Sequence, residues 1–164
     1  MVLHAAGKET EMQMPGEFED AKLNLFQAIV QQAPDAIIFA DRGGAIRIWN
    51  RGAETVFGYA AAEVLGKSLE IIIPERLRDA HWEGFRQAID TGQTKYGRRV
   101  LTTRSVHKNG SKLYVDLSFG LVKDEAGAVT GAMAIGRDGT ARYLSDGALR
   151  ARVAELEKTK DSEF

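Results

Sequence analysis

Cysteine is absent from this chain of 164 residues. Its absence excludes disulfides, thiolate metal sites, thiol redox chemistry and the C-x-x-C-H attachment of haem c. Proline is scarce, with only three residues, so each proline marks a position where a helix begins or ends. No run of about eighteen apolar residues occurs, which excludes a membrane-spanning helix. We therefore expect a cytoplasmic protein with no membrane partner.

The chain has no excess of charge of either sign, with a net charge of −1. A general binder of nucleic acid needs a basic stripe, so we expect no nucleic-acid partner. Residues 1–16 are polar and lack the continuous apolar segment of a signal peptide, which predicts a disordered leader. The length suits one domain with extensions.

Two short alternating apolar runs, at residues 36–40 and 45–50, predict a β-hairpin. The segment between them, DRGG, supplies the aspartate and glycines that a tight connection needs. Short helices should follow, because Ala53, Val56 and Phe57 repeat at helical spacing and Gly58 ends the run.

Longer helices are predicted on either side of this region. Residues 17–33 carry an apolar stripe that ends before Pro34, and Pro74 should open one continuous helix over residues 75–90. Three more strands follow, at residues 98–106, 112–122 and 129–137, and the links between them read as hairpin turns. Residues 146–160 predict a last helix whose Leu149, Val153 and Leu156 begin a coiled-coil seam.

This order of elements resembles the PAS family of sensor domains. The resemblance covers roughly residues 25–142, and four motifs carry it: PDAIIFAD, the N-x-x-A-E-x-x-F-G-Y run from Asn50, E-x-x-G at 63–66, and the strand end at 136–138. It implies an α+β fold, with a five-stranded antiparallel sheet, short helices on one face, and helical extensions at both ends. The expected divisions are a leader (1–16), a cap helix (17–33), the PAS core (34–142) and a C-terminal helix (143–164).

Within this family, the missing cysteine excludes two kinds of photosensor. The flavin-binding blue-light branch forms its photoadduct through a cysteine, and the photoactive yellow protein branch attaches its chromophore to one. Neither chemistry is open to this chain.

His81 is the strongest candidate for a functional residue. Leu77, His81 and Phe85 follow at intervals of four on the predicted helix, so they should share one apolar face and point inward. Gly84 leaves space beside the imidazole. A buried histidine must hydrogen-bond, coordinate a metal or lose its charge, and neutral imidazole is a good iron ligand. Trp82, the next residue, should instead meet the N-terminal helix or a partner.

The haem-binding branch of the family, which includes oxygen sensors of nitrogen-fixing bacteria, carries its proximal histidine on this helix in a similar Pro-Glu-x-x-x-x-x-His pattern. The resemblance implies that His81 binds the iron of haem b. The sheet would form the distal wall through Leu101, Leu117 and Phe119, with Met133 as a weak candidate for a sixth ligand.

Leu101 falls where those oxygen sensors place a distal arginine. An apolar wall offers bound dioxygen no hydrogen-bond donor, so carbon monoxide, nitric oxide or redox sensing would fit better.

A cofactor-free PAS domain is the alternative reading. Many such domains carry a similar stretch, and His81 would then only bond a backbone carbonyl. The terminal helices would drive homodimerisation in either case, and a downstream signalling protein, fused or acting in trans, would receive the output. No nucleophile lies beside a base and an orienting acid, so we expect no enzymatic activity.

Overall fold

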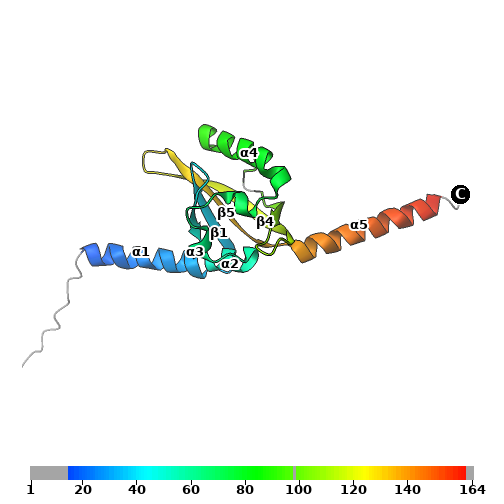
Figure 1. Ribbon diagram of the computed structural model, residues 1–164, viewed down its shortest axis with the longest axis horizontal. Coiled ribbons are helices and arrows are strands. Elements are labelled where there is room, and N and C mark those ends of the chain that lie inside the picture. Colours follow the sequence, from blue (N-terminus) through cyan, green and yellow to red (C-terminus); the bar gives the residue numbers. More distant parts are fainter. Residues whose placement is uncertain (1–14, 98, 162–164) are drawn as a thin grey trace, which may run out of the picture.

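The computed structural model describes residues 15–97 and 99–161, and these form an α+β fold around one antiparallel sheet (Figure 1). The five strands lie in the order β2-β1-β5-β4-β3. Their bounds are β1 Ala36–Asp41, β2 Ile46–Trp49, β3 Leu101–Val106, β4 Lys112–Lys123 and β5 Val129–Asp138. The predicted fold class is therefore confirmed, and β3 begins three residues later than the sequence suggested.

The β1–β2 hairpin forms for the reason given by its sequence. Asp41 accepts hydrogen bonds at Oδ1 from the backbone N–H groups of Gly43 and Ala45, both at 3.0 Å. Gly44 has a φ of 79°, a backbone conformation that glycine adopts without steric cost. Hydrogen bonds to the Asp41 side chain and the conformation of Gly44 thus stabilise the turn.

Short helices follow the hairpin on one face of the sheet. Asn50 caps the first of them, and Gly58 ends it in the left-handed conformation, with a φ of 78°. The helices of this region are α2 Arg51–Phe57, α3 Ala61–Val64, and the 3-10 turns η1 Leu69–Ile72 and η2 Glu75–Leu77. Helix α4, Arg78–Thr91, then runs beside the sheet and ends at Gly92.

The core lies between the sheet and the short helices. Ile38, Val115 and Leu117 from the strands pack with Phe57 and Val64, and all five side chains are buried. The opposite face of the sheet is polar along β4, where it carries Tyr114, Asp116 and Ser118. Elsewhere that face is apolar and partly exposed, at Phe39, Ile48, Val122 and Met133.

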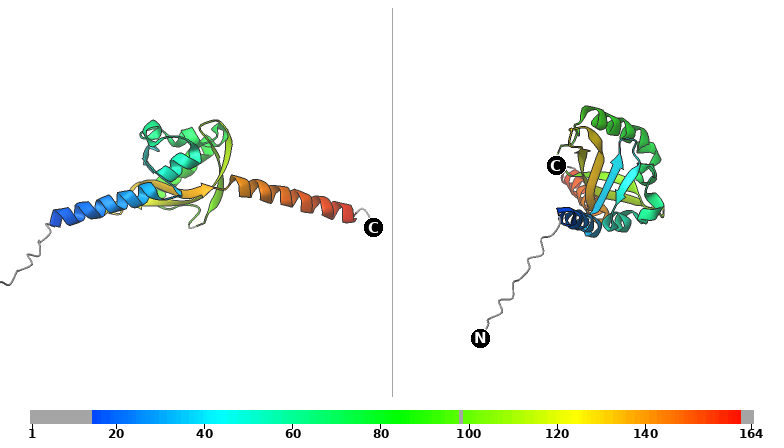
Figure 2. Two further views of the ribbon diagram at one scale, coloured as in Figure 1. Left: turned by 90° about the horizontal axis from the view of Figure 1, so that it is seen from below. Right: turned by 90° about the vertical axis from the view of Figure 1, so that its left-hand side faces the viewer.

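Two long helices extend from the core in opposite directions (Figure 2). They are α1, Pro15–Gln32, and α5, Thr140–Asp161. Within the described residues, no helix combines the length and apolar character needed to cross a membrane.

Both helices differ in extent from the predicted divisions. Residues 1–14 of the expected leader lie outside the described residues, whereas Pro15 and Gly16 belong to α1. Helix α5 begins six residues earlier than predicted, because Thr140 starts it directly after β5. The N–H of Thr140 donates to Asp138 at 2.8 Å, and its hydroxyl accepts from the backbone N–H of Tyr114 at 3.0 Å. The predicted boundary after residue 142 therefore falls inside the helix.

Candidate ligand site between helix α4 and the sheet

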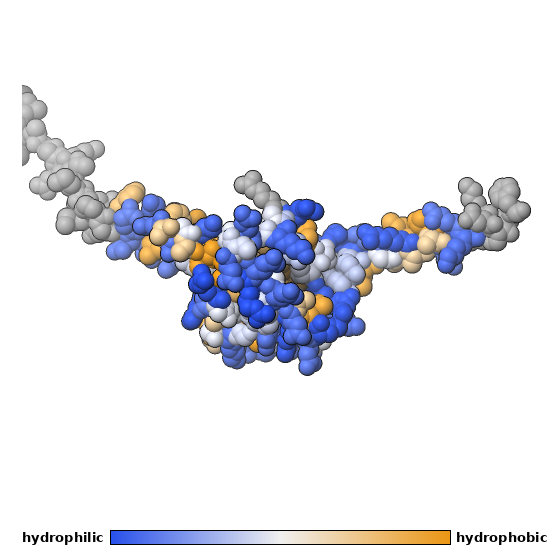
Figure 3. Space-filling model, turned by 90° about the horizontal axis from the view of Figure 1, so that it is seen from above, coloured by the Kyte–Doolittle hydropathy of each residue, from blue (hydrophilic) through white to orange (hydrophobic). Residues whose placement is uncertain are grey.

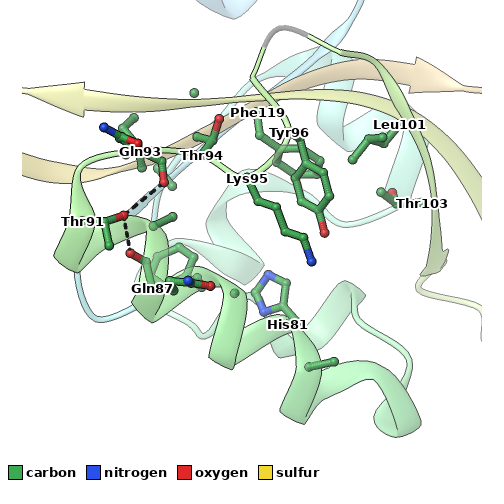
Figure 4. Close-up of a pocket in the computed structure, with 17 residues that line it drawn as sticks. His81, Gln87, Thr91, Gln93, Thr94, Lys95, Tyr96, Leu101, Thr103 and Phe119 are labelled. Atoms are coloured by element: carbon green, nitrogen blue, oxygen red, sulfur yellow. Dashed lines mark hydrogen bonds between the residues drawn. The ribbon is translucent and has the colours of Figure 1, made fainter.

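A cavity of about 620 Å³ lies between α4, the segment that follows it, and the helix-covered face of the sheet (Figure 4). Ligand cavities in proteins span roughly 300–1,000 Å³, so this one has the size of a cofactor site. Residues from α4, from 91–96 and from β3, β4 and β5 line it. Phe85, Leu101, Phe119, Leu121 and Ala132 make much of the wall apolar.

His81 projects from α4 into this cavity, and its ring faces the sheet (Figure 4). Its Nδ1 is buried and has no hydrogen-bond partner among the described atoms. The ring lies nearly parallel to Phe85, with centroids 6.0 Å apart. In the cofactor-free alternative, His81 would bond a backbone carbonyl, and no such bond forms at Nδ1 in the described structure. The accessible part of the ring borders the cavity.

The surroundings of His81 favour its neutral form. Burial lowers the pKa of the ring below its ordinary value of 6.5, and the nearby Glu70 carboxylate opposes this effect only in part. The imidazole is thus uncharged near neutral pH, which is the form that binds metal ions. In the described part of the chain, no three His, Cys, Asp or Glu residues gather into a metal site. A metal here would consequently need further ligands from a cofactor.

Trp82 fixes α4 against the hairpin. Its indole Nε1 donates to the Glu70 carboxylate at 2.7 Å. Its ring covers Gly44, where an added Cβ would lie 2.2 Å from the indole. Trp82 thus packs against η1 and the β1–β2 turn, and not against the N-terminal helix as one alternative of the sequence analysis had it.

Five of the predicted site residues line the cavity together: His81, Gly84, Phe85, Leu101 and Phe119. At Gly84 an added Cβ would meet no atom within 4 Å, in agreement with the predicted space beside the imidazole.

Three other predicted residues do not line the cavity. Leu77 ends η2 with φ −107° and ψ −4°, so the predicted continuous helix is broken there and its side chain borders a different hollow. Leu117 pairs with Leu101 across β3 and β4, but its side chain is enclosed in the main core. Met133 alternates with Ala132 and Ala134, which face inward, so it lies on the outer face of the sheet and is 36% exposed.

The sequence reasoning missed the polar side of the cavity. Lys95 and Tyr96 enter it from the segment after α4, and Thr103 borders it from β3 (Figure 4). Among the described lining residues, Lys95 is the only charged side chain apart from the titratable His81, and none is a carboxylate. The expectation that the cavity wall carries no hydrogen-bond donor is therefore wrong. No periodic pattern could have placed Lys95 and Tyr96, because they belong to a loop.

The fold is that of an α+β domain with a cavity beside α4. The chain belongs to the PAS fold family, whose model matches residues 24–139. Domains of this family serve in sensor and signalling proteins.

Three curated proteins are similar in sequence to part of this chain. An uncharacterized protein of Azorhizobium caulinodans is 33% identical over 93 residues, which are 56% of this chain and 13% of the relative. Sensor protein FixL of Bradyrhizobium diazoefficiens is 29% identical over 68% of this chain and 22% of its own length. Oxygen sensor protein DosP of Escherichia coli is 28% identical over 61% of this chain and 12% of its own length. The chain thus spans less than a quarter of each relative.

Solved structures support the fold. The PAS domain of a protein from Colwellia psychrerythraea superposes with a TM-score of 0.63 at 23% identity, covering 73% of this chain and 98% of that domain. An RNA-binding Light-Oxygen-Voltage receptor superposes with a TM-score of 0.65 at 24% identity. That match covers 95% of this chain and 42% of the receptor, so it includes much of the terminal helices.

Proposed function

We propose that this chain is a sensory PAS module that holds haem b in the cavity beside α4, with His81 as the axial ligand to the iron. The observation that carries the proposal is the position of the His81 imidazole, which borders a cavity of about 620 Å³ while its Nδ1 has no described partner. Burial lowers the pKa of the ring, which favours the form that binds iron. The Pro74-Glu75-x-x-x-x-x-His81 spacing, which resembles that of the haem-binding PAS branch, supports it.

The residues of the cavity suit the chemistry of haem b, a flat apolar ring with two carboxylates and an iron that takes axial ligands. Leu101, Phe119 and Leu121 offer an apolar surface to the ring. Lys95 offers a cation to a carboxylate. When bound, the haem would supply an iron centre that takes up a diatomic gas or changes its oxidation state.

The chain's own side chains would determine which signal is favoured. Tyr96, Lys95 and Thr103 carry hydrogen-bond donors and line the same cavity as His81. A donor favours a polar gas ligand, so dioxygen joins carbon monoxide and nitric oxide as a candidate. That two relatives are named as sensors, one of them an oxygen sensor, agrees with this choice. The role that we propose for the cavity is ligand binding and not catalysis.

Titration of the purified protein with hemin tests the proposal. We expect a sharp Soret band that saturates at one hemin per chain and is lost in His81→Ala. His107→Ala, in the β3–β4 turn, is the matched control and should keep the band. A spectrum that stays that of free hemin in the unaltered protein, or a band that survives in His81→Ala, contradicts the proposal.

A second candidate function is cofactor-free homodimerisation, and a separate observation favours it. Helix α1 leaves large apolar side chains exposed, and α5 does the same, as the hydrophobic patches along both helices in Figure 3 illustrate. On α1 these are Phe18, Leu23, Leu25, Phe26 and Ile29; on α5 they are Leu144, Leu149, Val153 and Leu156. A second copy of the chain would cover them.

In this view the helices relay the signal by changing how two copies pair. The output would reach a downstream signalling protein in the cytoplasm, fused to the chain or acting in trans. The two candidates are compatible, since a haem sensor can also be a dimer.

Light scattering over a concentration series tests the pairing. Phe26→Asp and Val153→Asp should each raise the dimer dissociation constant at least about tenfold, which corresponds to roughly 1.4 kcal/mol. Leu65→Asp is the matched control, because Leu65 is also exposed but lies at the end of α3. A mass that is unchanged in both helix variants argues against the dimer.

A further inference from the structure

A second hollow, of about 370 Å³, lies where the sheet meets the start of α5. Its lining comes from η2, β3, β4 and α5, and consists of Arg76, Leu77, Thr102, Arg104, Tyr114 and Tyr143. Two guanidinium groups therefore border one hollow, and none of its described lining residues is a carboxylate.

Arg104 is the more enclosed of the two cations. It is half-buried, and its guanidinium carbon lies 5.5 Å from the centre of the Tyr114 ring. Its Nη2 donates to the Tyr114 hydroxyl at 3.3 Å. A guanidinium has five N–H donors, and a partly desolvated cation is stabilised by an anionic partner. No ion pair to Arg104 occurs among residues 15–97 and 99–161.

Arg76 is exposed at the same hollow and likewise forms no ion pair with a described carboxylate. Thr102, which lines the hollow, donates its hydroxyl to the Asp116 carboxylate. Asp116 is already paired with Arg142 at 2.6 Å, so its charge is compensated. The two arginines thus keep their positive charge available to a ligand.

We propose that this hollow binds a small oxyanion, a phosphate or carboxylate group, between Arg76 and Arg104. Guanidinium groups bind both kinds of oxyanion through parallel charge-assisted hydrogen bonds. The Tyr114 and Tyr143 rings, stacked 3.7 Å apart, form an aromatic wall beside it. The site does not involve His81 or its cavity, so it is independent of the proposed haem function.

Binding here would act on the base of α5. Tyr143 lies in the first turn of that helix and stacks on Tyr114. The backbone carbonyl of Tyr114 also accepts a hydrogen bond at 2.8 Å from the N–H of Gly139, the residue just before α5. An anion that draws the Arg104 guanidinium toward itself would lengthen the 3.3 Å hydrogen bond from Arg104 to the Tyr114 hydroxyl. The oxyanion would therefore change the contact that fixes where α5 leaves the core.

The test is a titration with inorganic phosphate, pyrophosphate and succinate at constant ionic strength, followed through the backbone amide signals of Tyr114 and Tyr143 in ¹⁵N-labelled protein. We expect saturable shifts, stronger with whichever of the phosphate or carboxylate probes is the preferred oxyanion. Arg104→Gln and Arg76→Gln should each raise the dissociation constant about tenfold. His81→Ala should leave it unchanged.

Arg86→Gln is the matched control, because Arg86 is an exposed cation on α4 that lines neither hollow. It should change the dissociation constant less than about twofold. Circular dichroism checks that each variant folds. If Arg104→Gln does not fold, Arg76→Gln alone tests the proposal, because Arg76 is exposed. The absence of saturable shifts up to about 20 mM of every probe overturns the proposal. Equal weakening by Arg86→Gln and Arg76→Gln overturns it as well.

Discussion

The side-chain amide of Asn50 donates to the main-chain oxygen of Val30 at 3.0 Å and so ties the start of α2 to the end of α1. The same amide also donates to the Asp35 carbonyl, while its oxygen accepts from the N–H groups of Ile37 and Ala53. Asn50 is fully buried. One side chain thus satisfies backbone groups from α1, β1 and α2 at once.

Asn50→Ala should therefore be strongly destabilising, at about 3 kcal/mol of unfolding free energy, because it removes a helix cap and leaves several buried backbone groups unpaired. Urea unfolding measures this loss. Asn109→Ala, which removes an exposed turn hydrogen bond to Ser111, is the control and should cost less than about 1 kcal/mol. Equal losses in the two variants would refute this account of Asn50.

Two substitutions at Gly84 test stability and ligand binding separately. Gly84→Ala should stabilise the protein by about 0.5–1 kcal/mol, because alanine favours the interior of a helix and the added methyl meets no neighbour. Gly84→Leu should instead fill part of the cavity and weaken hemin binding about tenfold. Thermal unfolding and Soret titration provide the two readouts. Unchanged hemin affinity in Gly84→Leu would place the ligand elsewhere.

The lowered pKa of His81 makes stability depend on pH in a defined direction. Below pH 6.5 the unfolded chain takes up a proton at this residue more readily than the folded chain, so the free energy of unfolding falls as the pH drops. The loss levels off once the pH is below the pKa of the folded state. We compare the protein with His81→Gln, because the other titrating groups cancel in the difference.

Urea unfolding at closely spaced pH values between 7.5 and 5 gives that difference. The unaltered protein should lose stability relative to His81→Gln as the pH falls through this range. A difference that stays constant, or that grows in favour of the unaltered protein toward acid pH, contradicts the buried, neutral state of the ring.

The Trp82–Glu70 hydrogen bond should control how firmly α4 is held over the cavity. Trp82→Phe keeps an aromatic ring against Gly44 but removes the indole donor, and it should cost about 1 kcal/mol. Hydrogen exchange of the α4 amides should become faster, whereas the exchange of β4 stays unchanged. Glu70→Gln retains an acceptor for the indole and should have the smaller effect. Uniform acceleration across both elements would show global destabilisation.

Local patterns in the sequence predict most of the fold. The aspartate and glycines of the β1–β2 turn, the alternation along β4 and the glycine after α4 each act through the backbone of their own segment. One of the two errors in helix bounds has a long-range cause, and the other has a local one. Helix α5 starts at Thr140 because that residue bonds to Tyr114 on β4, and Leu77 leaves the predicted helix because Pro74 accepts a tight-turn hydrogen bond from it at 2.8 Å.

The candidate site was predictable on its helix and on part of its sheet wall. His81, Gly84 and Phe85 follow from helical spacing, whereas Leu101 and Phe119 follow from the resemblance to the haem-binding PAS branch. Lys95 and Tyr96 come from an irregular segment whose direction depends on packing, so no sequence period indicates them. Met133 was assigned to the cavity although strand alternation with its neighbours places it on the other face of the sheet.

Strand β4 connects the cavity to the root of α5, so it can transmit a small tilt from one to the other. It carries Phe119 at the cavity wall and Tyr114 at the root of α5, five residues or roughly 17 Å apart along one rigid ribbon. The 22 residues of α5 form a rod about 33 Å long. By simple leverage, a tilt of roughly five degrees at the ribbon's end moves the rod's far tip by about 3 Å. A change too small to disturb the core can thus become a displacement comparable to an atomic diameter.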